Sequence, residues 1–99
     1  GLVEAISIPQ TECFASALQF ARSEGIVPAP EPTHALAAAI REALACKESG
    51  EEKVILTALC GHGHLDLASY DKYMNGEMHD LDLSDAQIAE AMRSVPVIA

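Results

Sequence analysis

A nearly all-apolar run at residues 54–59, VILTAL, constrains this chain more than any other stretch of its sequence. Its apolar residues do not alternate with polar ones, which is typical of a strand that is covered on both faces. The run passes directly into the loop CGHGHLD at 60–66. Open α/β enzymes present ligand-binding groups in the loops that follow such strands. We therefore expect any chemistry of this chain to lie just after Leu59.

Apolar spacing and helix-stop signals predict four helices. Two precede this run, near 9–24 and 33–49, and two follow it, near 67–74 and 85–94. Ser7 with Gln10, and Ser84 with Gln87, form capping-box patterns before the first and last of them. Between the first two helices, residues 26–32 contain three prolines in alternation, which predicts a stiff, extended connector.

These elements predict an α/β fold class. A strand that is covered on both faces belongs to a sheet of several strands, yet 54–59 is the one strong candidate, and 1–8 is a weak strand or a lead-in coil. We expect a helix-rich fragment of a three-layer α/β/α domain with one central parallel strand. Residues 1–99 would then be a single domain or fragment whose missing strands come from elsewhere. The first residue is Gly1, not methionine, which fits either tag removal or an excerpt of a longer chain.

Charge and cysteine usage exclude several classes of protein. Six Lys and Arg against fifteen Asp and Glu give a net charge of −9, which would repel a phosphate backbone, so no nucleic-acid partner is expected. No apolar run approaches the roughly 20 residues that cross a bilayer, and no secretion signal is evident. Cys13, Cys46 and Cys60 are odd in number and widely spaced, which favours a reducing compartment, the cytoplasm.

The loop at 60–66 allows four interpretations. Every second residue in it is a possible metal ligand: Cys60, His62, His64 and Asp66. A structural interpretation is that Gly61 and Gly63 turn the chain at positive φ and that Asp66 caps the next helix. A third is that the glycines let the backbone approach a cofactor closely. A fourth is a thiolate nucleophile at Cys60 with His62 or His34 as its base.

Glu31 is a second candidate, because it stands where the 33–49 helix opens. A carboxylate is favourable near the positive end of a helix whatever its function. The functional interpretation is that the prolines around it aim Glu31 into the same cleft as Cys60. The two interpretations are compatible.

Two stretches of the chain resemble C-terminal motifs of the tryptophan synthase beta chain, particularly of its longer beta-like branch. They are EGIVPAPEPTHA at 24–35 and ALCGHGHLD at 58–66, and the resemblance covers most of 1–79. It implies the C-terminal part of a fold type II enzyme, a lyase that uses pyridoxal phosphate to condense serine with indole into tryptophan. The implied partners are the upstream part of the same enzyme, a second copy in a homodimer and an alpha subunit.

The resemblance also implies roles for single residues. Cys60 stands where the family normally has a serine whose hydroxyl contacts the pyridine nitrogen, and a thiol is a longer, weaker hydrogen-bonding group. Glu31 matches a glutamate near the cofactor ring. Gly61 and Gly63 match loop glycines, and His62 stands where other members carry arginine or histidine. The family's Schiff-base lysine and glycine-rich phosphate loop lie upstream, so the segment by itself is expected to have no catalytic residue and no activity.

Two alternatives stay open from the sequence. One is a non-catalytic binding or interaction domain in which Cys60, His62 and His64 hold a metal. The other is a pyridoxal-phosphate enzyme that catalyses β-replacement or β-elimination on a different amino acid. The cofactor interpretation requires that Cys60 and Glu31 face one shared crevice.

Overall fold

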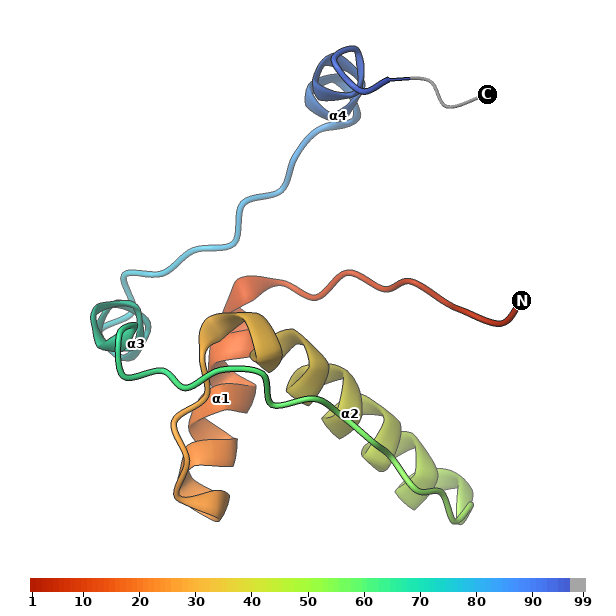
Figure 1. The fold of residues 1–99 in the computed structure, drawn as a ribbon, viewed down its shortest axis with the longest axis vertical. Coiled ribbons are helices and arrows are strands. Elements are labelled where there is room, and N and C mark those ends of the chain that lie inside the picture. The colour runs from red at the N-terminus through yellow and green to blue at the C-terminus, as the bar shows by residue number, and fades with distance from the viewer. Residues whose placement is uncertain (97–99) are drawn as a thin grey trace.

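The computed structural model describes residues 1–96, which contain four helices and no β-strand. The helices are α1 (Gln10–Glu24), α2 (Pro30–Ser49), α3 (Leu67–Met74) and α4 (Asp85–Met92). α1 packs against α2 and α3, whereas α4 stands apart at the end of an extended arm (Figure 1). The predicted α1 and α3 are confirmed to within one residue, and residues 1–8 form the lead-in coil. None of these helices is both long and apolar enough to span a membrane.

The connector predicted at 26–32 is shorter than expected, because α2 begins at Pro30 and not at 33. Pro30 and Pro32 occupy the first turn, where a proline loses no intrahelical hydrogen bond. The hydroxyl of Thr33 donates to the Pro30 carbonyl within that turn. Glu31 therefore lies on the first turn of the helix and not on an extended proline frame.

α1 is capped by a distant part of the chain. Its N-cap position is Pro9, which provides no side-chain cap, so the capping box expected from Ser7 and Gln10 is not formed. Instead, the Asp80 carboxylate accepts hydrogen bonds from the backbone N–H of Thr11 at 2.9 Å and from its hydroxyl at 2.5 Å. A carboxylate is stabilised at the positive end of a helix. This contact ties the segment after α3 to the start of α1.

The core is small and lies where α1 meets α2 and α3. The Phe14 ring makes an edge-to-face contact with Tyr70, with ring centroids 5.1 Å apart, and stacks on Tyr73 at 5.7 Å. Ala17 is fully buried beside them. A second buried cluster lies between the lead-in coil, α1 and α2: Ile8, Cys13 and Ala37. An ion pair between Glu12 and Arg41 also joins α1 to α2.

The strand predicted at 54–59 is not formed within residues 1–96. The segment runs extended along α2 (Figure 1), but none of its backbone groups is paired with another segment of the described chain. Val54 and Leu56 are 99% and 95% exposed, while Ile55 is 38% exposed and lines a groove with α2 residues. A strand needs neighbouring strands to satisfy its backbone. Because residues 1–96 supply none, the apolar run remains unpaired.

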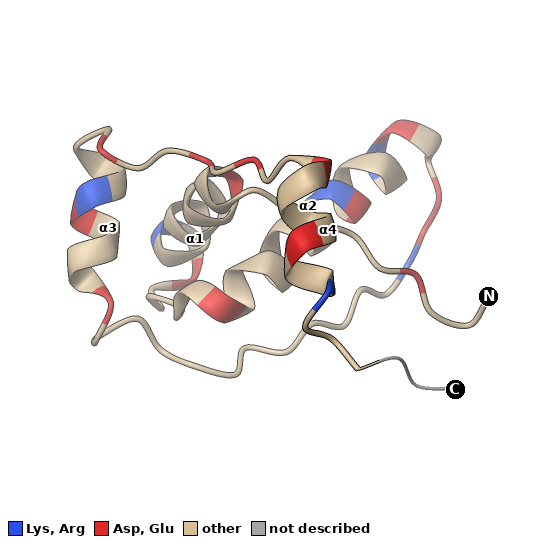
Figure 2. Cartoon of the chain, turned by 90° about the horizontal axis from the view of Figure 1, so that it is seen from above, with Lys and Arg blue, Asp and Glu red and all other residues tan. Residues whose placement is uncertain are grey.

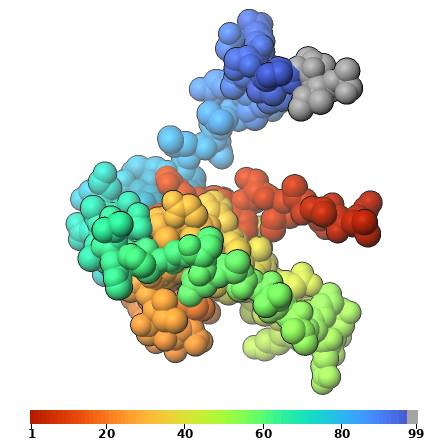
Figure 3. All heavy atoms as spheres, in the orientation of Figure 1, coloured from red at the N-terminus to blue at the C-terminus, as the bar shows by residue number. Residues whose placement is uncertain are grey.

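α4 has the capping box that the sequence predicted, but it ends at Met92, two residues early. The side chain and backbone of Ser84 exchange hydrogen bonds with Gln87. All residues of this helix are exposed, and the space-filling view shows it clear of the helical body (Figure 3). Acidic side chains outnumber basic ones over much of the chain, α4 included (Figure 2). Local capping, and not packing, therefore defines α4.

The two carboxylates that hold α1 should make the fold sensitive to acid. The hydrogen bond from Arg41 lowers the pKa of Glu12 from its ordinary 4.5, and the hydrogen bond from the Thr11 hydroxyl lowers the pKa of Asp80 from its ordinary 3.8. A carboxyl whose pKa is lowered on folding stabilises the folded state above its ordinary pKa and loses that contribution as the pH falls through the lowered value. We expect helix content to fall below about pH 4.

Carboxyl chemical shifts followed by NMR from pH 7 to pH 2 measure both pKa values directly. Arg41→Met should return the pKa of Glu12 towards its ordinary value and leave that of Asp80 low. Thr11→Val should raise the pKa of Asp80 alone. Equal pKa values in the wild type and both variants would contradict these contacts.

Candidate functional site

The loop after residue 59 lies against the segment that leads into α2. The Ala29 N–H donates to the Gly61 carbonyl at 3.0 Å, and the Gly63 N–H donates to the Val27 carbonyl at 2.8 Å. These two bonds flank an antiparallel bridge between Pro28 and His62. The two stretches that carry the family resemblance are therefore side by side in space.

Gly61 and Gly63 are required by the closeness of this pairing. A Cβ at position 63 would lie 2.5 Å from the Pro28 carbonyl oxygen and 2.9 Å from a methyl group of Val27. A Cβ at position 61 would lie 3.0 Å from the Ala29 Cβ. The expectation of positive-φ turns here is wrong, because the glycines with positive φ are others: Gly25, Gly50 and Gly76. The loop glycines allow close backbone approach, and the backbone they approach is the chain's own.

Tyr70, on α3, reaches this pairing from the side. Its hydroxyl donates to the Pro28 carbonyl at 2.5 Å, and its ring lies 3.1 Å from where a Cβ of Gly63 would be. Burial raises the pKa of the Tyr70 hydroxyl, with a further contribution from Asp66, so the group stays protonated as a donor. Sequence reasoning missed this residue. The i,i+3 spacing of Tyr70 and Tyr73 indicates a buried helix face, but not which carbonyl the hydroxyl meets.

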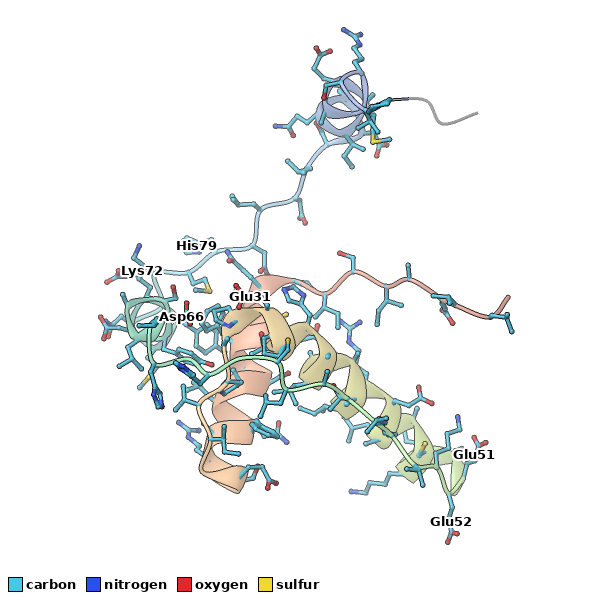
Figure 4. All side chains as sticks on the ribbon, in the orientation of Figure 1. Glu31, Glu51, Glu52, Asp66, Lys72 and His79 are labelled. Atoms are coloured by element: carbon cyan, nitrogen blue, oxygen red, sulfur yellow. The ribbon has the colours of Figure 1, made fainter. Side chains whose placement is uncertain are left out.

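Cys60 and Glu31 lie close in sequence to the hydrogen bond between Ala29 and Gly61, one on each of the two paired segments. Cys60 is next to Gly61 in the chain, and Glu31 follows Ala29 by two residues. Both side chains are exposed, and the Cys60 thiol is free. Figure 4 shows Glu31 at the start of α2. The pairing thus brings the two backbones together, while a crevice shared by the two side chains stays a prediction.

The possible metal ligands of the loop are gathered only as a pair. The rings of His62 and His64 lie 4.7 Å apart, and the His64 N–H donates to Nδ1 of His62 at 3.3 Å. In the part of the chain that the structure describes, no group of three or more His, Cys, Asp or Glu side chains is arranged to hold a metal ion. Asp66 occupies the N-cap position of α3 without a side-chain cap. Within residues 1–96, the metal interpretation has two neighbouring imidazoles and no third ligand beside them.

Lys53 is engaged in ion pairs and is not a free amine. Its ammonium group lies 2.9 Å from Glu42 and 3.2 Å from Glu51. The hydrogen bond to Glu42, followed by that to Glu51, raises the pKa of Lys53. A lysine that forms a covalent bond to a carbonyl needs the opposite shift.

A methyl group at position 63 should separate the loop from the Pro28 segment. Gly63→Ala places a Cβ against backbone that cannot rotate away, so we expect a loss of about 1–3 kcal/mol in the free energy of unfolding. Gly61→Ala meets only the Ala29 methyl group and should cost less. Urea unfolding followed by circular dichroism measures both. Equal losses in the two variants would contradict the closer contacts that the structure shows at position 63 than at position 61.

Comparison with known proteins identifies relatives over most of the chain, although no family model matches it. Tryptophan synthase beta chain 2 of Methanosarcina mazei is 64% identical over 78 residues, which are 79% of this chain and 18% of the relative. That of Aquifex aeolicus is 61% identical over 80 residues, which are 81% of this chain and 18% of the relative. That of Pyrococcus furiosus is 45% identical over 96 residues, which are 97% of this chain and 22% of the relative. The chain belongs to the tryptophan synthase beta chain family and corresponds to a C-terminal part that spans about a fifth of the length of these relatives.

Proposed function

We propose that residues 1–99 supply one wall of the pyridoxal-phosphate site in a tryptophan synthase beta-type lyase. The observation that carries this proposal is the pairing of 27–29 with 61–63, which brings together the two stretches that resemble the family's motifs. Cys60 and Glu31, one from each of these stretches, are both exposed. The resemblance places the family's Schiff-base lysine upstream of this segment, so we propose that residues 1–99 are inactive without the rest of the chain.

In the complete enzyme, 54–59 would be a central parallel strand of a three-layer α/β/α domain of fold type II. Three features support this. The segment is already extended, its backbone is unpaired within residues 1–96, and Val54 and Leu56 present a second apolar face to solvent. Strands with unpaired edges and two apolar faces are completed by neighbouring strands and a covering layer.

The residues present fit a flat heteroaromatic ring. Cys60 offers an exposed, free thiol, and Gly61 and Gly63 let the loop that carries it lie close to the segment leading into α2. When bound, pyridoxal phosphate withdraws electrons from the amino-acid substrate. A neutral thiol at the ring nitrogen would leave that nitrogen unprotonated, while His62 would border the loop. Glu31 would place a carboxylate near the ring hydroxyl.

We also propose the substrates, partners and compartment of the complete enzyme. Serine and indole would be its substrates, and a homodimer and an alpha subunit its assemblies. These proposals rest on the relatives being tryptophan synthase beta chains. A cytoplasmic location is supported by three free cysteines, which are typical of a reducing compartment.

A chimeric chain tests the proposal. Residues 1–99 would replace the C-terminal part of the Aquifex aeolicus beta chain, which is 61% identical over 80 residues. We expect the chimera to bind pyridoxal phosphate and to form tryptophan from serine and indole, measured by cofactor absorbance and product formation. The 99 residues alone should form none. A chimera that folds but binds no cofactor would overturn the proposal.

The contact made by Cys60 can be tested in the same chimera. Cys60→Ser should raise the rate, because a hydroxyl is a stronger hydrogen-bonding group than a thiol. Cys60→Ala should lower it on the order of tenfold and shift the absorbance of the bound cofactor, because the ring nitrogen loses its partner. Cys46→Ser on α2 is the matched control and should change neither. If Cys60→Ala behaves as the wild type, Cys60 does not contact the ring.

A further inference from the structure

We infer that Tyr70 is a positioning residue for the proposed cofactor site, which it serves by holding the Pro28 carbonyl through its hydroxyl. The inference rests on the proposed function. Tyr70 lies on α3, outside both stretches that carry the family resemblance. Its 2.5 Å hydrogen bond to Pro28 nevertheless acts on the pairing that those stretches form.

The pairing has few bonds of its own. Two backbone hydrogen bonds join 27–29 to 61–63, and Pro28 at its centre has no N–H to donate. The Pro28 residue is almost completely buried, so its carbonyl cannot turn to water. An unsatisfied buried carbonyl is costly. The Tyr70 hydroxyl therefore supplies a third bond to a short contact in which the buried Pro28 carbonyl would otherwise be an unpaired acceptor.

The position of the Tyr70 hydroxyl is itself fixed by the core. The ring packs edge-to-face on Phe14 of α1 and is buried to 5% exposure. One carbon of the ring lies 3.1 Å from where a Cβ of Gly63 would be. Tyr70 thus connects α1 to the loop, and it holds Pro28 and Gly63 at one distance from each other. The spacing between Cys60 and Glu31 depends on that distance, because Cys60 lies three residues before Gly63 and Glu31 lies three residues after Pro28.

Tyr73 provides a matched control on the same helix. It stacks on the same Phe14 ring, with centroids 5.7 Å apart. Its hydroxyl forms no hydrogen bond within residues 1–96, unlike that of Tyr70. Tyr73→Phe and Tyr70→Phe therefore remove the same atom from the same ring cluster, and only the second removes a bond to the paired segments.

Hydrogen exchange and cofactor binding test the inference in the chimera. In the cofactor-free chain, Tyr70→Phe should speed exchange of the Ala29 and Gly63 amides on the order of tenfold while leaving the interior amides of α1 unchanged. It should weaken pyridoxal phosphate binding by a similar factor and shift the absorbance of the bound cofactor. Tyr73→Phe should change none of these quantities.

Each outcome decides the point. Unchanged exchange at Ala29 and Gly63 in Tyr70→Phe, or equal changes in Tyr73→Phe, would overturn the inference. Faster exchange at those amides with unaltered cofactor affinity and absorbance would limit Tyr70 to a structural role and would overturn it as well. If the wild-type chimera binds no pyridoxal phosphate, the proposed function fails, and so does the role of Tyr70 in it, whereas the exchange data still show whether Tyr70 holds the pairing.

Discussion

The antiparallel contact between 27–29 and 61–63 is the constraint on which the rest of this structure depends. It closes the chain from the end of α1 to the start of α3 with two backbone hydrogen bonds. Everything near the candidate site follows from its closeness: the absence of side chains at Gly61 and Gly63, the buried Pro28 carbonyl and the reach of Tyr70. Such short pairings are marginal in water by themselves, so this one depends on the small aromatic core beside it.

The rest of the chain is consistent with a part of a larger domain. The described core consists of two small clusters around α1, while the most apolar segment of the sequence lies exposed along α2. Exposed apolar surface of this kind marks a place where another part of a protein packs. The match of about a fifth of the relatives' length agrees with this interpretation.

Local signals predicted the helices well, and long-range partners explain where prediction failed. Gly25 and Gly50 end α1 and α2 at positive φ, and Ser84 with Gln87 caps α4, because each device acts within one turn. The predicted strand at 54–59 is absent because a strand depends on neighbours that residues 1–96 do not contain. The cap of α1 was assigned to Ser7, whereas it comes from Asp80, which no local pattern could indicate.

The sequence by itself determined the family, the four helices and the two stretches in which the candidate residues Cys60 and Glu31 lie. It could do so because motifs and helical periodicity depend only on residues that are close together in the sequence. Only the tertiary structure decided that these stretches pair, that Gly61 and Gly63 serve that pairing and not a turn, and that Tyr70 holds the Pro28 carbonyl. The physical reason is that a hydrogen bond between distant segments depends on how helices pack. α1 and α3 set that packing through Phe14 and its neighbours, and α1 and α2 set it through Cys13 and Ala37.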